Sequence, residues 1–463
     1  MSISRAGHLA RAALAALLCT GLIACDSDEK SAKTDNAFAN DCDLDAQKYR
    51  LRQYMDDQYF WYASMPHPDA TLFADITSYF YALRFTGDAF MPRGDIWSYA
   101  MSTTDFNAFY TQSRQLGWGF SVTDALIPEY PGVALLVRYV EPQSPAAQAG
   151  LLRGETLVSI NNTPSFDYLN TDPYSLNAVL TAQAAGDRLD LVVRNAQGIE
   201  RNVAVFADSF SLTPMPLSHP IESPAGKPIG YVMVKDFTED ILTPLETAFA
   251  DFKAMGIQEI VIDLRYNGGG LASAARTLAS YAGGSSFTNS TFAQYNFNDK
   301  NQEYNFAINF EYLRSAMPAT RVFVLTSAST CSASELVINS LTPFVDVVQI
   351  GGSTCGKPVG FIPYDDQCGI LYSAVNFEVF NAAGEGRYWN GLAPRCVVAD
   401  DFSHPLGDSD EALLATARHY VDQGECPITT AEATAMARKR TTDFPRTRPP
   451  IIAGEQPSAM ILP

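Results

Sequence analysis

The chain has 463 residues, more than one ordinary hydrophobic core accommodates, and we therefore expect two or three folded domains. Hydrophobic residues make up 47% and charged residues 18%, a composition that argues against a wholly disordered chain. The formal net charge is −19 and no long basic run is present, which argues against nucleic acid as a partner.

Residues 1–24 have the pattern of an export signal. Arg5 and Arg11 precede a short apolar stretch that ends at Ala24, and this stretch is shorter than the roughly 20 residues of a membrane-spanning helix. The sequence Leu-Ile-Ala-Cys25 resembles a bacterial lipobox, in which Cys25 is lipidated and becomes the first residue. Cleavage there removes two arginines and no acids, so the net charge changes from −19 to −21. We expect a membrane-anchored lipoprotein of the bacterial cell envelope that faces the periplasm; the alternative is an ordinary signal peptide followed by a chance cysteine.

Six cysteines follow Cys25, and an even number in an exported chain predicts disulfides. They are Cys42, Cys331, Cys355, Cys368, Cys396 and Cys426. We expect at least two disulfides, and we favour Cys355–Cys368 because these residues bracket Pro358–Asp366, which could form a hairpin. The cysteines lack the paired CxxC spacing of a zinc site and the five histidines are scattered, so we expect neither a metal site nor a cofactor.

The first half of the mature chain falls into three parts. Residues 25–41 are small and polar and predict a flexible spacer. Residues 42–115 predict an N-terminal helical domain, because aromatic and apolar residues recur there at roughly helical spacing. Residues 116–208 predict a β-rich domain with strands at 133–137 and 189–193.

Two motifs of the β-rich domain resemble PDZ domains, specifically the circularly arranged type of bacterial proteases. The first is Gly117-Trp118-Gly119-Phe120, and the second is the helix start Ser144–Leu151, followed by a strand. The two glycines would let successive backbone N–H groups form a nest for a carboxylate, beside a strand edge that adds an extended peptide. The motif therefore predicts binding of protein C-termini; the alternative is a plain β-rich domain.

Residues 209–430 alternate strands and helices and predict an α/β core. We expect buried strands at 229–234, 259–264, 321–326 and 347–350 and helices at 243–255, from 271 and at 333–340. The tail at 431–463 contains several prolines, and we expect it to be loose from Phe444 onward.

Ser332 lies between an expected buried strand and an expected helix. A serine hydroxyl there would sit beside free backbone N–H groups and the positive end of a helix dipole, which stabilise an oxyanion. Ser332-x-x-Glu335 is also a capping box, in which the serine only caps the helix. Lys357 lies 25 residues further on, and a lysine near a serine becomes a general base if burial lowers its pKa.

Together these features resemble the carboxyl-terminal processing (tail-specific) proteases, a family of Ser–Lys enzymes in which a helical segment and a PDZ domain precede an α/β core. The resemblance covers roughly residues 45–425. Its matching stretches are the PDZ-like segment, Asp263–Gly270, Ser332–Glu335, Gly356-Lys357 and Gly391–Pro394. The resemblance implies a multidomain α/β protein with a protease core of the tail-specific type.

The resemblance also implies roles for individual residues. Ser332 would be the nucleophile and Lys357 the general base, and the backbone N–H groups of Ala333 and Gly270 would form the oxyanion hole. The chain departs from the family at two positions. Cys331 replaces the alanine of the family's TASASE motif, and Phe361 replaces the glutamine that often orients the lysine from four residues beyond it.

The resulting expectation is a serine endopeptidase that cuts proteins or peptides with free C-termini through an acyl-enzyme. The alternatives are an inactive tail-binding scaffold lipoprotein, supported by Phe361 and Cys331, and a purely structural envelope lipoprotein. A Ser–His–Asp mechanism would use His219 or His404, each of which is followed by proline.

Overall fold

The computed structural model of the chain describes residues 42–89, 91–123, 135–171, 173–317, 319–428 and 457–462. The expected export signal, Cys25 and the spacer to residue 41 lie outside the described residues, as does most of the expected tail. From Cys42 onward the chain forms one compact unit. None of its described helices is both long and apolar enough to cross a membrane.

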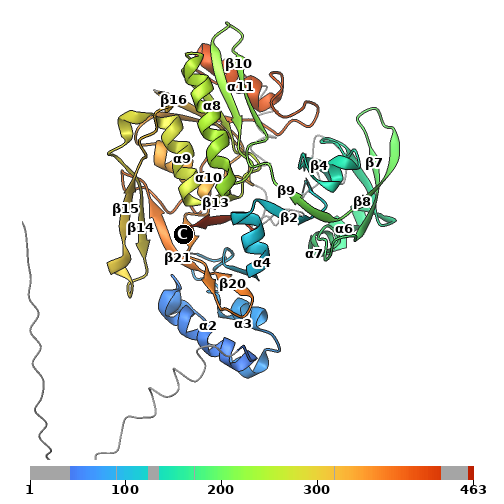
Figure 1. Ribbon diagram of the computed structural model, residues 1–463, viewed down its shortest axis with the longest axis vertical. Helices are drawn as coiled ribbons and strands as arrows, with labels where there is room; N and C mark the ends of the chain where they lie inside the picture. The colour runs from blue at the N-terminus through green and yellow to red at the C-terminus, as the bar shows by residue number, and fades with distance from the viewer. Residues whose placement is uncertain are drawn as a thin grey trace, which may run out of the picture. The chain divides into compact units, whose positions relative to one another are not determined.

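A six-stranded sheet forms the centre of the α/β core (Figure 1). Its order is β10–β11–β12–β16–β17–β22, and every neighbouring pair except β10–β11 is parallel. The strands span Leu217–Glu222, Pro228–Met233, Glu259–Asp263, Arg321–Thr326, Asp346–Gly351 and Cys396–Val397. Parallel strands are buried on both faces and therefore have nearly continuous apolar sequences, which is why β11, β12, β16 and β17 were predictable.

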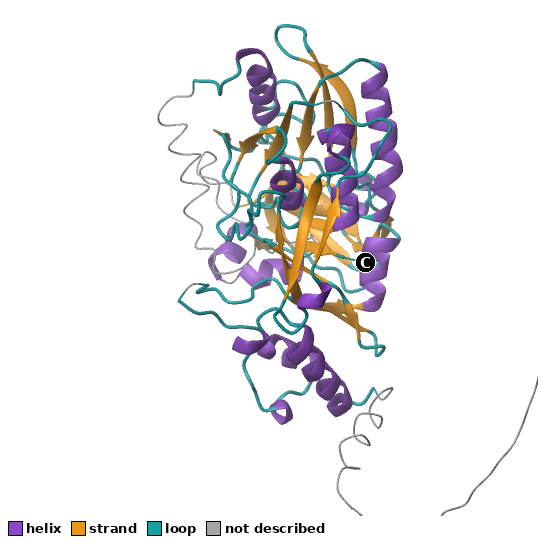
Figure 2. Cartoon of the chain, turned by 90° about the vertical axis from the view of Figure 1, so that its left-hand side faces the viewer, coloured by secondary structure: helices purple, strands orange, loops and turns teal. Residues whose placement is uncertain are grey.

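Helices cover both faces of this sheet, as Figure 2 shows. Helices α8 (Leu242–Ala254), α9 (Ala272–Gly283) and α10 (Ala333–Leu341) pack on one face, and α11 (Ala412–Gln423) packs on the other. The short helix η4 (Glu239–Ile241) precedes α8. Because α9 and α10 follow parallel strands β12 and β16, their N-termini meet at the same edge of the sheet.

A second six-stranded sheet, which the sequence analysis did not predict, lies beside α9 and α10. Its order is β13–β23–β18–β21–β14–β15. The strands span Gly269–Leu271, Ala459–Ile461, Val359–Phe361, Val375–Phe380, Thr291–Phe297 and Phe306–Asn309, with short helices η5 (Ser285–Phe287) and η6 (Gln302–Tyr304). The expectation of a loose tail is therefore wrong for residues 459–461, which form the inner strand β23.

The N-terminal part contains the expected helices and also a strand that was not expected. Helices α2 (Leu44–Gln58), η1 (Tyr62–Ser64), η2 (Ala70–Leu72) and α3 (Ile76–Leu83) come first. Strand β1 (Tyr99–Ser102) then pairs with β20 (Ile370–Ser373), which also pairs with β19 (Tyr364–Asp365). Helices α4 (Thr103–Phe106) and η3 (Asn107–Thr111) follow. The apolar residues of this part share a core with Val359, Phe361 and Ile461, so the N-terminal helices help to build the site.

The β-rich domain has a sheet with the order β3–β4–β5–β7–β8, in which β6 pairs with β5. These strands span Phe120–Val122, Leu135–Val140, Thr156–Ile160, Arg188–Arg194, Glu200–Phe206 and, for β6, Thr163–Pro164. The helices are α5 (Pro145–Gln148), α6 (Ser165–Thr171) and α7 (Pro173–Val179), and the connecting strands β2 (Arg114–Gly117) and β9 (Asp208–Ser211) pair with each other. Ser144 caps α5 by accepting a hydrogen bond from Ala147 N at 3.2 Å.

Three disulfides join the six cysteines, so the expectation of at least two is confirmed. The pairs are Cys42–Cys368, Cys331–Cys355 and Cys396–Cys426. The predicted pair Cys355–Cys368 is wrong. The chain between these two residues does not form a hairpin, because β18 pairs with β21 and β23 whereas β19 pairs with β20.

Candidate active site

Three loops meet at the carboxyl ends of β12, β16 and β17 and carry all the residues predicted for catalysis. Backbone hydrogen bonds connect them: Cys331 N donates to Asn267 O at 3.1 Å, and Cys355 N donates to Thr330 O at 3.0 Å. The carboxyl ends of parallel strands are where open α/β sheets bind their ligands. The topology therefore places the candidate site where this class of fold supports one.

The buried Glu335 carboxylate, in the first turn of α10, holds two of these loops together. Its Oε2 accepts hydrogen bonds from Ser332 N at 2.9 Å and from Lys357 N at 2.8 Å. Its Oε1 accepts from Thr354 Oγ1 at 2.5 Å and from Gly356 N at 2.8 Å. Burial raises the pKa of Glu335, and the hydrogen bonds oppose this rise. The backbones of Ser332 and Lys357 are thus fixed to one carboxylate oxygen.

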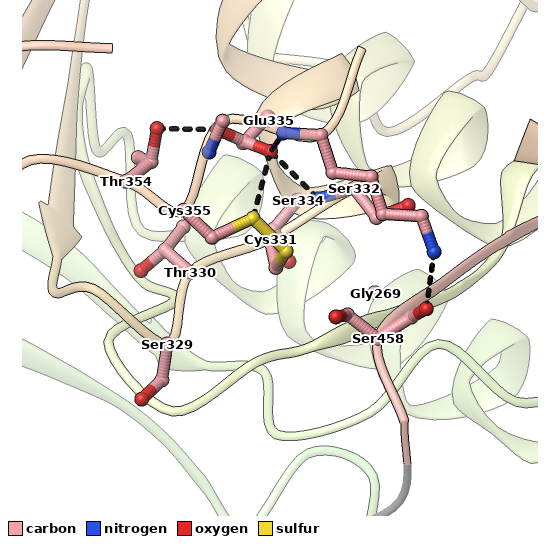
Figure 3. The surroundings of a disulfide bond; sticks show 12 residues. Gly269, Ser329, Thr330, Cys331, Ser332, Ser334, Glu335, Thr354, Cys355 and Ser458 are labelled. Atoms are coloured by element: carbon pink, nitrogen blue, oxygen red, sulfur yellow. Dashed lines mark hydrogen bonds between the residues drawn. A yellow bond between two sulfur atoms is a disulfide. The ribbon is translucent and has the colours of Figure 1, made fainter. Parts of the chain in front are cut away.

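The disulfide Cys331–Cys355 links the same two loops covalently (Figure 3). Cys331 directly precedes Ser332, and Cys355 lies two residues before Lys357. The sequence analysis treated Cys331 as a departure from the family motif, and the structure gives that cysteine a bridging role. Glu335 and the two sulfurs also form a cluster of metal-ligand atom types, but disulfide sulfurs are not thiolate ligands.

Ser332 is buried and has a strained backbone, with φ +61° and ψ −111°. Such angles are rare for a residue with a side chain and concentrate at functional sites. Its Oγ has no hydrogen-bond partner among the described residues. Ser332 and Glu335 occupy the positions of a capping box, but Ser332 Oγ makes no hydrogen bond to the backbone of α10 among the described residues.

The glycine turn after β12 approaches the N-terminus of α10, as the oxyanion-hole prediction requires. A Cβ on Gly269 would lie 3.1 Å from Ala333 N, and a Cβ on Gly270 would lie 2.2 Å from Phe237 O. Both glycines have positive φ, at +110° and +134°, so a side chain at either position would be strained as well as crowded. Glycine is needed here because backbone atoms pass on either side.

The side chain of Lys357 is completely buried, and burial lowers its pKa well below the ordinary value, although nearby Asp95 and Glu335 oppose this shift. The Nζ atom lies 4.0 Å from the centre of the Phe361 ring and 5.6 Å from that of Trp97. It donates a hydrogen bond to Ser458 O. These surroundings exclude water from the amine and favour its neutral form.

The PDZ-like loop has the tight geometry that its glycines suggested. A Cβ on Gly119, whose φ is +79°, would lie 1.9 Å from Ser144 Cβ. The carbonyl of Trp118 accepts a hydrogen bond from Ala146 N at 2.9 Å, which fixes the loop against α5. The following strand β3 is the edge strand of its sheet within the described residues.

A cavity of about 1010 Å³ extends from the PDZ-like loop to residues that surround Lys357. Gly117–Phe120 and Leu180 line it on the PDZ side, and Asp95, Trp97 and Ser458 line it beside Lys357. One continuous space thus reaches the PDZ-like loop and the surroundings of the predicted base.

The comparisons with known proteins agree with this geometry. Residues 228–394 match the model of peptidase family S41, which includes Ser332 and Lys357. Residues 46–99 match the S41 N-terminal domain, and residues 136–195 match a PDZ domain. The chain thus contains a peptidase family S41 core, preceded by an S41 N-terminal domain and a PDZ domain.

Individual S41 relatives are distant. The carboxyl-terminal-processing peptidase 2 of Arabidopsis thaliana chloroplasts is 25% identical over 164 residues, which is 35% of this chain and 31% of that protein. A structure assigned to an S41 protease of Bacteroides fragilis has 25% identity and a TM-score of 0.64, and the match covers 81% of this chain and 97% of that one. The photosystem II D1 C-terminal processing protease shares the fold, with a TM-score of 0.50, 18% identity and coverage of 82% and 99%.

Three residues around the S41 site were missed by the sequence analysis. Asp95 and Trp97 belong to the N-terminal part, and Ser458 belongs to the tail. No local sequence pattern identifies these three residues. Each lies near Lys357 only because segments that are distant in sequence pack together. The two histidines considered for a Ser–His–Asp mechanism make hydrogen bonds outside the candidate site. His404 contacts Asp401 at 2.7 Å, and His219 contacts Gly407 O at 3.3 Å.

Replacing Lys357 by methionine is expected to stabilise the folded chain at neutral pH. Because burial lowers the pKa of Lys357, the unfolded chain binds a proton at this amine more tightly than the folded chain does. The buried amine therefore lowers the free energy of unfolding, and this penalty is greatest at low pH. The penalty disappears as pH rises toward the ordinary lysine pKa of about 10.4. Urea unfolding between about pH 6 and pH 10 should therefore show a stability gain that shrinks with pH.

The exposed Lys253 provides the matched control, since Lys253→Met should show no such trend. A gain for Lys357→Met that stays constant across this pH range would show that the amine is charged in the folded chain.

Proposed function

We propose that this chain is a serine endopeptidase that cuts proteins near their C-termini with a Ser332–Lys357 pair, while its PDZ-like domain holds the substrate tail. The observation that carries the proposal is the unpartnered Ser332 hydroxyl, held in strained backbone and fixed through Glu335 to a buried lysine. A residue kept only to cap a helix would use its hydroxyl for that purpose.

The chemistry follows from these groups. Neutral Lys357 Nζ takes the proton of Ser332 Oγ as this oxygen attacks the scissile carbonyl. The ammonium then gives the proton to the departing amine as the carbon–nitrogen bond breaks, which leaves an ester on Ser332. Lys357 next takes a proton from water as the water attacks the ester, and it returns this proton to Ser332 Oγ as the ester bond breaks and the new C-terminus leaves.

The developing oxyanion is assigned to the backbone N–H groups of Ala333 and Gly270. Ala333 N is at the N-terminus of α10, where the helix dipole adds to the attraction. The Gly269–Gly270 segment approaches it closely, which supports a shared binding position for one oxygen.

Recognition of the tail is assigned to Gly117–Phe120 and the free edge of β3. An extended peptide would add to that edge and end with its carboxylate in the loop. The cavity that extends from this loop to Ser458, whose carbonyl accepts the hydrogen bond of Lys357, supports a route from the held tail toward the catalytic pair.

Export and lipid anchoring at Cys25 in the bacterial envelope are part of the proposal. The three disulfides support export, because disulfides persist in oxidising compartments such as the periplasm.

The variants Ser332→Ala and Lys357→Ala should each lower kcat/KM on a peptide substrate by roughly 10³-fold or more, and the double variant should be no worse than either single one. Lys357→Arg should be equally inactive, because arginine stays protonated. Ser334→Ala, which changes a residue inside α10 two positions beyond Ser332, should have a much milder effect. A serine-reactive phosphonate should label Ser332 in the parent chain; no labelling and no hydrolysis would favour the inactive scaffold.

Phe361→Ala should move the acid limb of the kcat/KM profile to higher pH. Removal of the ring that lies 4.0 Å from Nζ admits water, and hydration raises the pKa of Lys357. Phe361→Leu, which keeps an apolar side chain, should leave the limb near its parent position. A limb that stays in place or moves to lower pH in folded Phe361→Ala would show that another residue excludes water from the base.

Amidating a peptide's C-terminus should weaken its binding to the Ser332→Ala chain about 10–100-fold, because charge-assisted hydrogen bonds are lost. Gly119→Ala should abolish the difference between the free and amidated peptides, since a Cβ there would lie 1.9 Å from Ser144 Cβ and distort the loop. Fluorescence anisotropy with labelled peptides measures both effects. Equal affinities for free and amidated peptides in the parent loop would refute recognition of the carboxylate.

A further inference from the structure

The tail of the chain lies in the candidate active site as an inserted strand. Strand β23 (Ala459–Ile461) pairs in parallel with β13 on one side and with β18 on the other. Ala459 N donates to Gly268 O at 3.1 Å, and Leu462 N donates to Phe361 O at 3.0 Å. The strand β23 thus lies in a gap with two walls. One wall is β13, which belongs to the glycine turn, and the other is β18, the strand that follows Lys357.

The inserted strand contacts the groups assigned to catalysis. Lys357 Nζ donates its hydrogen bond to Ser458 O, and Figure 3 shows Ser458 near the Cys331–Cys355 disulfide. The Ala459 carbonyl faces Gly269: a Cβ on this glycine would lie 2.0 Å from Ala459 O and 3.1 Å from Ala333 N. Consecutive carbonyls of the tail thus lie at the assigned base and against Gly269, the residue before the assigned donor Gly270.

Glycines on both walls make room for a peptide backbone. A Cβ on Gly269 would lie 2.0 Å from Ala459 O, and a Cβ on Gly360 would lie 2.6 Å from Met460 O as well as 2.4 Å from the Phe377 ring. Both carbonyl contacts are to backbone atoms of the occupant, which every peptide has. The gap between β13 and β18 is therefore suited to an extended chain irrespective of most of its side chains.

We propose that this gap is the groove that binds the cleavage-site segment of a substrate, and that residues 457–462 occupy it as an intramolecular inhibitor. The inference rests on the proposed function, since it names the peptide-binding subsite of that same site. The ligand class is an extended peptide that adds as a strand parallel to β13, with small or unbranched apolar residues where Ala459 and Met460 now lie buried.

An occupied groove cannot carry out the reaction. The Lys357 N–H group is engaged with Ser458 O, and Ser332 Oγ is buried without a partner. A substrate must displace the tail before its own carbonyl reaches Ser332. The measured activity then depends on the fraction of chains whose groove is free.

The test cuts the chain after folding. A site for a specific protease is inserted within residues 429–456, and the folded chain is assayed before and after cleavage and removal of the tail. Labelling of Ser332 by a phosphonate and kcat/KM on a peptide should both rise, by about tenfold where the tail had occupied the groove nine-tenths of the time. A synthetic peptide with the sequence of residues 457–463 should inhibit the cut chain competitively.

A point variant tests the same groove in the uncut chain. Met460→Asp places a carboxylate in a fully buried apolar position, which should expel the strand and raise the labelling rate. Ile428→Asp introduces the same charge at a fully exposed site upstream and should leave the labelling rate unchanged.

The outcomes separate this inference from the proposed function. Binding of the 457–463 peptide to a cut Ser332→Ala chain requires no catalysis, so binding without hydrolysis by any variant would support the groove and refute the protease. Equal hydrolysis by cut and uncut chains, with no peptide binding, would refute the groove and keep the protease. Unfolding or loss of labelling after the cut, together with loss of labelling in Met460→Asp, would show that β23 is a structural strand and overturn the inference.

Discussion

The Glu335 carboxylate is the acceptor on which the geometry of the candidate site depends. Four hydrogen bonds converge on it, from both loops that carry the Ser332–Lys357 pair. A buried carboxylate is stable only when its oxygens are paired, so these loops have little freedom to rearrange. The Cys331–Cys355 disulfide restrains the same loops a second time, on the chain directly before the serine and shortly before the lysine. The departure from the family's alanine at position 331 thus reinforces an arrangement that the carboxylate already sets.

Buried strands of the parallel sheet were predictable because their apolar runs are local and continuous, as in Glu259–Asp263. The Ser332–Lys357 pair was found because its spacing and flanking residues resemble a known family. Strand β23 could not be found in the same way. Three residues carry no periodic signal, and the strand exists only because β13 and β18 leave a gap for it. The predicted pairing Cys355–Cys368 was wrong for a related reason: a hairpin between these cysteines is locally plausible, but β18 takes its partners from distant parts of the chain.

Lys357 shows how the N-terminal part contributes to the site. Its apolar surroundings combine Phe361, from the next strand, with Trp97, from the chain before β1. Asp95 from the same N-terminal stretch acts in the opposite direction, since its charge raises the lysine pKa while burial lowers it. The balance favours the neutral amine because burial is the larger effect. The aromatic ring at position 361 contributes to this burial, because it keeps water away from the amine.

In the proposed mechanism, the donors assigned to the transition state are also those that a peptide backbone in the groove would meet. A site that stabilises an oxyanion must present preorganised N–H groups to a carbonyl oxygen, and any extended backbone that enters the groove brings carbonyls to those groups. Substrate, product and the chain's own tail therefore compete for the groove through similar backbone contacts. The amino-acid sequence of each affects its affinity only through the side chains. The tail has the advantage of being tethered, which raises its effective concentration above that of a free peptide of equal affinity. A separate grip on the substrate at the PDZ-like loop would give the substrate the same advantage, since a peptide held there also meets the groove as a tethered ligand.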